Sequence, residues 1–369
     1  MNAAPRRVLL IRNPASASSR QQADRLGRFV SLLAEGGVRC DIRVTEHAGH
    51  ALELARTHAD GFECVIAAGG DGTVHEVASG LIAGGSKAAL AVAPFGRGND
   101  VAQLIGVWGS EGRGDEPAVR AILAPRPVTI DTIRVTWRDQ ASAAGVSSGN
   151  PAADGEQVRH AILLGGVGFV GELLRKTTPG TVRWFGPRWC YSAGFFRALL
   201  SFQPPVLRVR SEQGEKVLSH AVAALVGNAP FAGGGLMRIG PGASMTDGVL
   251  ELTFIEAVGR WELALQFVRL LRGTHVRHRQ VRFLRGAWLE VSADPPQALA
   301  LDGELLGTSP VRFEVNPSSL TLLAGPEASM GNTGSGIDWG VFEKKNPTKV
   351  FSRIASRFRM EIGPCFRWC

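Results

Sequence analysis

The residues best suited to chemistry lie in a glycine-rich stretch that follows an apolar run. Val65–Ala68 reads as a buried strand, and Gly69-Gly70-Asp71-Gly72-Thr73 follows it directly. We expect Thr73 to cap a helix that continues to about Ala83. Such a junction aims unpaired backbone N–H groups and the positive end of a helix dipole at one point, which favours a phosphate. The same pattern also occurs in ordinary turns between a strand and a helix, so the glycines alone do not decide between the two.

Asp71 narrows the choice of ligand. A carboxylate repels a phosphate unless a cation or a hydrogen-bond network separates them. A nucleotide that carries Mg²⁺ suits both the glycines and the carboxylate, so we predict this ligand at the turn. The chain has no Gly-x-x-x-x-Gly-Lys-[Ser/Thr] motif, so the predicted site is not a P-loop.

Three further clusters combine glycines with polar side chains. Pro94–Asp100 is a second glycine turn, which ends in Asn99-Asp100. Asp247 follows Asn228 and a glycine run, and with neighbouring backbone carbonyls it would form an oxygen-only site for Mg²⁺ or Ca²⁺. The sequence Asp302-Gly303-Glu304 places two carboxylates two residues apart after a strand. Each acidic pair alone is more often turn chemistry than catalysis.

Residues 7 to about 105 alternate strands and helices, which predicts a parallel sheet covered on both faces. Ligands of such sheets bind beyond the carboxyl ends of the strands. Asn13, Thr45 and both glycine turns follow strands, so we expect them to converge on one cleft. The expected elements are the strands Val8–Ile11, Arg39–Val44, Val65–Ala68 and Ala89–Ala93 and the helices Arg20–Glu35 and Gly49–Ala59.

The second half of the chain has a different texture. From about Thr129, short runs rich in Val, Ile and Leu recur, interrupted by helical patterns at Ser192–Ser201 and Arg260–Arg272. This pattern predicts a β-rich, sandwich-like domain. We therefore expect an α/β nucleotide-binding domain over 1–128, a β-rich second domain over 129–325, and a linker with a basic tail over 326–369.

Composition limits the partners. A net charge of +8 over 369 residues favours an anionic partner, and a single Tyr argues against a stacking platform for single-stranded nucleic acid. No uncharged apolar run approaches the ~18 residues of a membrane span. The segment Thr348–Met360 has the pattern of a basic amphipathic helix, which suits an anionic membrane surface or docking on the protein itself. Five scattered cysteines favour buried thiols in a reducing compartment.

Taken in order, the motifs resemble those of one family. Asn13-Pro14, Gly69–Thr73, Pro94–Asp100, the Asn228 to Gly248 region and Asp302-Gly303-Glu304 appear in the sequence of the diacylglycerol kinase catalytic-domain family. The resemblance is particularly to the soluble bacterial lipid kinases related to sphingosine kinases, and it covers roughly Arg7–Leu323. NAD kinases and phosphofructokinases share the Gly-Gly-Asp-Gly motif, and the resemblance implies that the N-terminal domain is similar to theirs.

The resemblance implies roles for individual residues. It implies that the β-rich domain over 129–325 binds the lipid substrate. Glu304, with Asp302 beside it, is similar to the base that takes the proton from the lipid hydroxyl. Asp71 is a further catalytic residue, which with Asp100 and Asp247 resembles the acidic cluster around the magnesium. Ser244, Asp247 and Val249 resemble the family's structural magnesium site. Arg97 departs from the family, which usually has Thr there, so nucleotide affinity is expected to be altered. The residues that match the ATP site are Asn13, Thr45, Gly69, Gly70, Asp71, Gly72, Thr73, Val74, His75, Gly96, Arg97, Asn99 and Asp100.

The resemblance implies an ATP- and Mg²⁺-dependent lipid kinase that phosphorylates diacylglycerol or a related lipid alcohol in phospholipid biosynthesis. The protein would be cytoplasmic and peripherally associated with the inner face of the membrane, without a nucleic-acid partner. The resemblance does not decide between a monomer and a homodimer. An NAD kinase and a non-catalytic lipid- or nucleotide-binding module are the alternatives. The candidates for an acyl-chain channel are Val167, Phe169, Phe195 and Phe196. The candidates for a basic surface are Arg269, Arg272, Arg277, Arg279, Arg282 and Arg285.

Overall fold

The computed structural model describes most of the chain up to Gly325. The described ranges are 4–14, 20–96, 98–108, 115–138, 156–177, 194–218, 221–229, 231–232, 237–238, 243–256 and 280–325, with single positions between 259 and 269. Arg97 and the predicted tail over 326–369 lie outside these residues.

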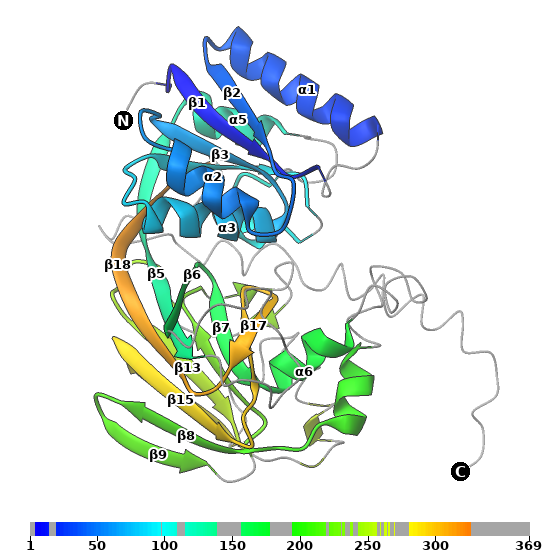
Figure 1. The fold of residues 1–369 in the computed structure, drawn as a ribbon, viewed down its shortest axis with the longest axis vertical. Coiled ribbons are helices and arrows are strands. Elements are labelled where there is room, and N and C mark those ends of the chain that lie inside the picture. The colour runs from blue at the N-terminus through cyan, green and yellow to red at the C-terminus, as the bar shows by residue number, and fades with distance from the viewer. Residues whose placement is uncertain are drawn as a thin grey trace, which may run out of the picture. The chain divides into compact units, whose positions relative to one another are not determined.

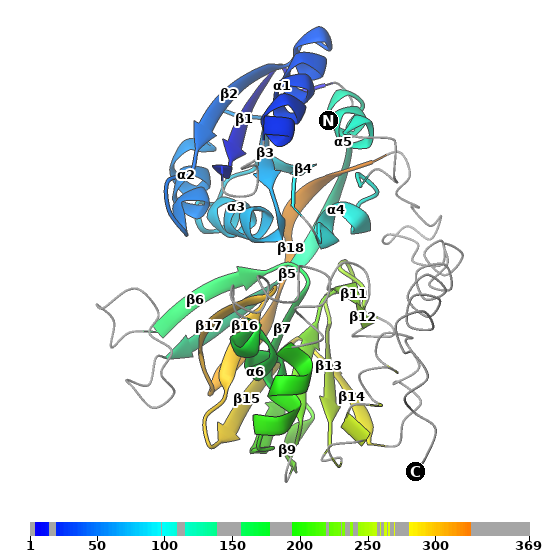
Figure 2. The same ribbon diagram turned by 90° about the vertical axis from the view of Figure 1, so that its right-hand side faces the viewer.

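The N-terminal part is the predicted parallel α/β layer structure (Figure 1). Its strands lie in the order β2-β1-β3-β4, and every neighbouring pair is parallel. Helices α2 and α3 pack together, and α1 packs against α5 on the opposite face (Figure 2). The strands are β1 (Arg7–Arg12), β2 (Arg39–Val44), β3 (Cys64–Gly69) and β4 (Ala89–Pro94). The helices are α1 (Arg20–Glu35), α2 (His50–His58), α3 (Asp71–Ala83), α4 (Asp100–Leu104) and α5 (Glu116–Leu123).

Helix α3 begins earlier than the sequence predicts. Its first residue is Asp71 and its N-cap is Gly70 in an extended conformation, so the prediction that Thr73 caps the helix is wrong. The Thr73 hydroxyl instead accepts a hydrogen bond from Asn13 Nδ2 at 3.2 Å. The helix therefore starts directly at the end of the strand, and its first N–H groups lie at the glycine turn.

The second half forms the predicted β-rich sandwich. In the described part, six strands extend the first sheet and six more form a second sheet in the order β14-β13-β10-β7-β16-β17. Buried residues of both sheets make one core, which includes Val135, Leu252, Leu289 and Phe313. The added strands of the first sheet are β5 (Arg126–Arg138), β6 (Glu156–Ala161), β8 (Val206–Ser211), β9 (Gly214–Leu218), β15 (Trp288–Asp294) and β18 (Val311–Ala324). The second sheet contains β14 (Val281–Gly286), β13 (Leu250–Ile255), β10 (Ala223–Gly227), β7 (Leu164–Gly168), β16 (Ala298–Leu301) and β17 (Glu304–Thr308).

Strand β18 links the two halves of this sheet. It pairs antiparallel with β5 from Val311 opposite Trp137 to Ala324 opposite Arg126, and its Leu322 pairs in parallel with Leu90 of β4. Strand β18 thus connects the N-terminal strands to the first sheet of the sandwich (Figure 2). The hairpin of β16 and β17 belongs to the second sheet, where β16 pairs with β7.

The remaining described helices are short. They are α6 (Phe169–Lys176) and a helix over 194–201. Over the stretches that the structure describes, none of the helices has the length and the apolar character that crossing a membrane requires.

Candidate active site

The two glycine turns touch each other through their backbones. A Cβ atom added to Gly96 would lie 2.3 Å from the Cα of Gly70, a distance that no real side chain tolerates. The amide of Phe95 donates to the carbonyl of Gly69 at 2.9 Å. Glycine is required at Gly96 because the backbone of the other turn fills the space of its side chain. The structure therefore brings together the two turns that the sequence predicted would meet.

Asp71 of the first glycine turn holds the second turn, Pro94–Asp100, through hydrogen bonds. Its carboxylate accepts the amides of Asn99 at 2.7 Å and Asp100 at 2.6 Å, which are the first N–H groups of α4. Asn99 adopts a left-handed conformation (φ 51°), and its side chain bonds both the N–H and the C=O of Gly96. Two amides offset the charge of the carboxylate, which explains how Asp71 lies in the turn that the sequence predicts as a phosphate site.

Asn13 and Thr45 lie at the carboxyl ends of β1 and β2. The side chain of Asn13 contacts the glycine turn through its hydrogen bond to Thr73. The backbone amide of Asn13 donates to the carbonyl of Ala68 at 3.1 Å. The amide of Thr45 donates to the carbonyl of Arg12 at 2.9 Å, and the residue is buried. The structure thus joins Asn13 to the turn, whereas a role for Thr45 in nucleotide binding stays a prediction.

Asp302 is held in a tight hairpin. Asp302 and Gly303 connect β16 to β17 with positive φ angles of 47° and 91°, which is the signature of a type I′ turn. The carboxylate accepts the amides of Ile162, Leu163 and Leu164 at distances between 2.7 and 3.0 Å. Three backbone donors hold the carboxylate in one position, so this geometry supports a positioning role for Asp302.

His75 of α3 contacts Asp302 across the site. Its Nδ1 lies 2.8 Å from Asp302 Oδ2, and the two side chains are 9% and 4% exposed. The contact is a close ion pair when the imidazole is protonated. Burial lowers the pKa of His75, but the charges of Asp302, Asp71 and Glu304 and the contact with Asp302 outweigh it, and the pKa is raised overall.

Glu304 faces the first turn of α3. A Cβ atom added to Gly72 would lie 3.0 Å from Glu304 Oε1, so the carboxylate reaches the glycine turn. The residue keeps contact with solvent, yet protein atoms crowd its carboxylate, and desolvation raises its pKa. The charges of Glu76 and Asp302 raise this pKa further, while His75 and Arg159 oppose the shift. An acceptor for a proton therefore stands opposite the predicted phosphate site.

The predicted magnesium residues lie in the loop before β13. Asp247 Oδ2 accepts a hydrogen bond from Arg285 at 2.7 Å, and its Oδ1 accepts the amide of Val249 at 3.2 Å. Mg²⁺ prefers oxygen ligands and would have to displace the guanidinium from the only carboxylate of the set. As they stand, these residues do not form a site ready for the cation, and the role of Ser244, Asp247 and Val249 stays a prediction.

Two buried groups organise this region: Asp131, which sequence analysis missed, and Asn228, which it named only as part of a motif. Asp131 is 3% exposed, and its carboxylate accepts the amides of Gly248 at 2.8 Å and Ser318 at 2.7 Å. Asn228 donates through Nδ2 to the carbonyls of Asp131 and Ile162. The available signal was a lone carboxylate within an apolar strand, because a buried charge requires compensating donors.

The predicted basic run is largely paired where it is described. Arg269 bonds Glu262 at 2.7 Å, and Arg282 bonds Glu256 at 3.3 Å. With Arg285 held by Asp247, these three guanidinium groups already have carboxylate partners. Arg272, Arg277 and Arg279 lie outside the described residues.

We expect Gly96→Ala to disrupt the site. The new methyl group would force the two turns apart, which should cost about 1–3 kcal/mol of unfolding free energy and weaken nucleotide binding by at least ~10-fold. Urea denaturation and a titration with ATP measure the two effects. Gly27→Ala in α1 is the matched control, because no atom lies within 4 Å of its added Cβ. Wild-type ATP affinity in Gly96→Ala would mean that the turns do not form the nucleotide site.

The His75–Asp302 contact should make stability depend on pH. Because the folded-state pKa of His75 is raised above its unfolded value of 6.5, its contribution is fully present below that pH and is lost as the pH rises through the folded-state pKa. Urea denaturation should therefore show that the unfolding free energy of wild type declines as the pH rises above 6.5, and His75→Gln should remove this decline. His58→Gln, at the exposed end of α2, should keep the decline.

Comparison with known proteins agrees with this geometry. The chain matches the model of the diacylglycerol kinase catalytic domain over residues 7–135 and that of the YegS C-terminal NAD kinase beta sandwich-like domain over residues 175–324. A protein of Chromohalobacter salexigens named "Probable lipid kinase YegS-like" is 30% identical over 325 residues, which cover 87% of this chain and 93% of the relative. The diacylglycerol kinase of Bacillus subtilis is 23% identical, with 84% and 93% covered.

A solved structure has the same fold. The crystal structure of a diacylglycerol kinase from Bacillus anthracis superposes with a TM-score of 0.61 at 18% identity, covering 87% of this chain and 98% of that one. The matched models and the 30% identical relative carry the family assignment. The chain therefore belongs to the family of lipid kinases that combine a diacylglycerol kinase catalytic domain with a YegS-type C-terminal domain.

Proposed function

We propose that this protein transfers the γ-phosphoryl group of ATP, in the presence of Mg²⁺, to the hydroxyl of diacylglycerol or a related lipid alcohol. The observation that carries the proposal is the approach of Glu304 to Gly72. An acid–base group on the β-rich half thus faces the phosphate turn of the α/β half. Phosphoryl transfer needs little beyond positioning, charge neutralisation and a base. This arrangement offers the positioning and the base.

The residues divide the work as follows. The N–H groups of Gly70–Thr73 hold the phosphates, and Asp71 keeps the second turn in place through the amides of Asn99 and Asp100. Glu304 takes the proton of the lipid hydroxyl while the oxygen of that hydroxyl bonds to the γ-phosphorus. The bond from that phosphorus to the bridging oxygen breaks, and ADP leaves with the electron pair. Mg²⁺ bound with the nucleotide supplies charge neutralisation.

A direct assay separates this proposal from its alternatives. Purified protein is incubated with labelled ATP and Mg²⁺, with a lipid extract in one reaction and NAD in another. A labelled lipid identified by mass spectrometry supports the proposal. Labelled NADP with unlabelled lipid would identify an NAD kinase instead. ATP binding without a labelled product in either reaction would identify a non-catalytic binding module.

A lipid kinase has to meet its substrate at a membrane, and one apolar surface suits this contact. On the helix over 194–201, Phe196 is 59% and Leu200 is 70% exposed, one turn apart, with exposed Arg197 beside them. Of the four channel candidates, Val167, Phe169 and Phe195 are buried; Phe169 and Phe195 stack edge to face at 5.3 Å. We include peripheral contact with the inner face of the membrane in the proposal, with Phe196 and Leu200 as its apolar anchor.

The double variant Phe196→Ser/Leu200→Ser should bind anionic liposomes at least ~10-fold more weakly than wild type, because each buried apolar side chain contributes about 1.5–3 kcal/mol. Cosedimentation with vesicles measures the effect. Val217→Ser on β9 is the matched control, since Val217 is also exposed but lies on another element. Wild-type binding of the double variant would remove this surface from the proposal.

A further inference from the structure

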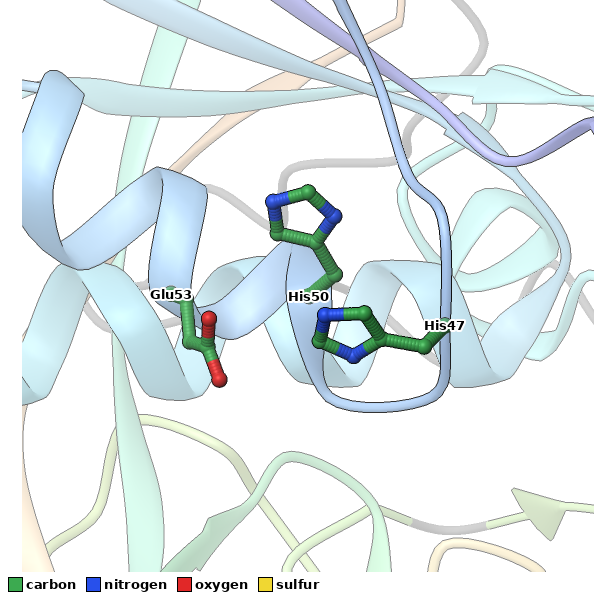
Figure 3. A group of neighbouring side chains, drawn as sticks. All are labelled: His47, His50 and Glu53. Carbon is green, nitrogen blue, oxygen red and sulfur yellow. The ribbon is translucent and has the colours of Figure 1, made fainter.

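Three side chains with donor atoms for a metal gather in the loop after β2 and at the start of α2, close to Thr45 in the chain. His47 lies in the loop after β2, His50 is the first residue of α2, and Glu53 follows one turn later. Their ligand atoms all lie within 4.8 Å of one another. Figure 3 shows the two imidazoles side by side, with the carboxylate of Glu53 near them, and the rings are stacked at 4.7 Å.

The hydrogen bond of His47 prepares its ring for a metal. Its Nδ1 lies 3.0 Å from the carbonyl oxygen of Ala48. A carbonyl can only accept, so Nδ1 carries the proton and Nε2 of the neutral ring keeps a free electron pair. Metal-binding histidines in proteins typically donate their other nitrogen to a carbonyl or carboxylate in this way.

His50 is less ready than His47. Its Nδ1 accepts the amide of Glu46 at 3.1 Å, so the proton of the neutral ring lies on Nε2. A metal must either replace this amide at Nδ1 or bind Nε2 after the proton has moved to Nδ1, and both routes break the hydrogen bond from Glu46. Binding therefore exchanges one modest hydrogen bond for a metal bond, which lowers the affinity below that of a fully preformed site.

The backbone that carries these ligands is held from the neighbouring helix. The carboxylate of Glu76 accepts the amides of Gly49 at 3.0 Å and Ala51 at 3.1 Å. Ala51 is buried, together with Leu54 and Ala55 of the same helix. A short segment fixed in this way presents its side chains with little backbone entropy left to lose.

We propose that His47, His50 and Glu53 form a binding site for a divalent transition-metal ion of the zinc class. Two imidazoles and one carboxylate suit Zn²⁺ and related ions better than Mg²⁺, which prefers an all-oxygen shell. Three protein ligands leave at least one coordination position for water or another small ligand. The proposal does not depend on the kinase activity.

Zinc binding to the tag-free, full-length protein tests the proposal by competition with a chromogenic chelator. Wild type should bind Zn²⁺ at this site, and His47→Ala and His50→Ala should each weaken that binding at least ~10-fold. His58→Ala on the same helix is the matched control, and it should bind like wild type. All three histidines are at least partly exposed, so these variants should fold normally.

Cobalt(II) distinguishes this site from one made by cysteines. The protein should give a Co²⁺ spectrum without the thiolate charge-transfer band, and His47→Ala should lose that spectrum. A thiolate band, binding that is unchanged in both histidine variants, or no competition with the chelator would each overturn the proposal.

Discussion

We expect Glu304→Gln to lower the rate of phosphoryl transfer by about 10²–10⁴-fold while ATP still binds with near wild-type affinity. Glutamine keeps the size of the side chain but cannot accept the proton of the lipid hydroxyl. Nucleotide binding should survive because Glu304 faces the turn at Gly72 and makes none of the bonds that join the two glycine turns. Single-turnover assays with labelled ATP measure transfer, and a separate ATP titration measures binding.

Glu215→Gln on the exposed strand β9 is the matched control, and it should leave both measurements unchanged. Turnover that persists in Glu304→Gln would move the base to Asp302 or Asp71. Both are less suited on structural grounds, because their oxygens already accept backbone amides.

The same residue should set the acidic limb of the pH profile. Desolvation raises the pKa of Glu304, so the fraction of ionised base should fall at a higher pH than for an ordinary glutamate. The rate of the chemical step should therefore rise with pH through this raised value. A chemical step whose rate does not change over this range would contradict the assignment of Glu304 as the base.

The sequence predicted the N-terminal elements well because each is encoded locally. The expected bounds of α1 and β2 agree with the structure, since helical spacing and the glycines after Glu35 mark the ends of these elements. The start of α3 was misplaced, because capping preferences favour Thr73 whereas the helix begins at Asp71 with Gly70 as its N-cap. No local pattern encodes the contact between Gly70 and Gly96, because it joins residues of two different turns.

The opposing half of the site could be predicted only in part. The motif marked Asp302 and Glu304 but did not separate their roles, because the donors to Asp302 come from Ile162–Leu164, far away in the chain. Strand β18 runs from Val311 to Ala324, past a register shift between Asn316 and Leu320. The polar residues at that shift interrupt the alternation on which strand prediction depends. The approach of Glu304 to Gly72 therefore follows from tertiary pairing.

Asp302→Ala should be the most destabilising of the substitutions considered, at about 3–5 kcal/mol of unfolding free energy. The change removes the acceptor of three backbone amides and leaves His75 buried without its counter-charge. A buried donor without a partner costs about 1–3 kcal/mol, which is why several such losses add up to a large effect. Urea denaturation at neutral pH measures it.

Asp302→Asn separates charge from shape. Asparagine also tolerates the left-handed backbone of the turn, but its amide group places a donor against one of the backbone N–H groups that Asp302 now accepts. The unfolding free energy of Asp302→Asn should lie between those of wild type and Asp302→Ala. Its rate of phosphoryl transfer should fall because the turn before Glu304 loses its fixed position. Asp24→Ala on the exposed surface of α1 should change stability by less than about 0.5 kcal/mol. If Asp302→Ala were as mild as this control, the anchored hairpin would not be what holds Glu304 opposite the phosphate turn.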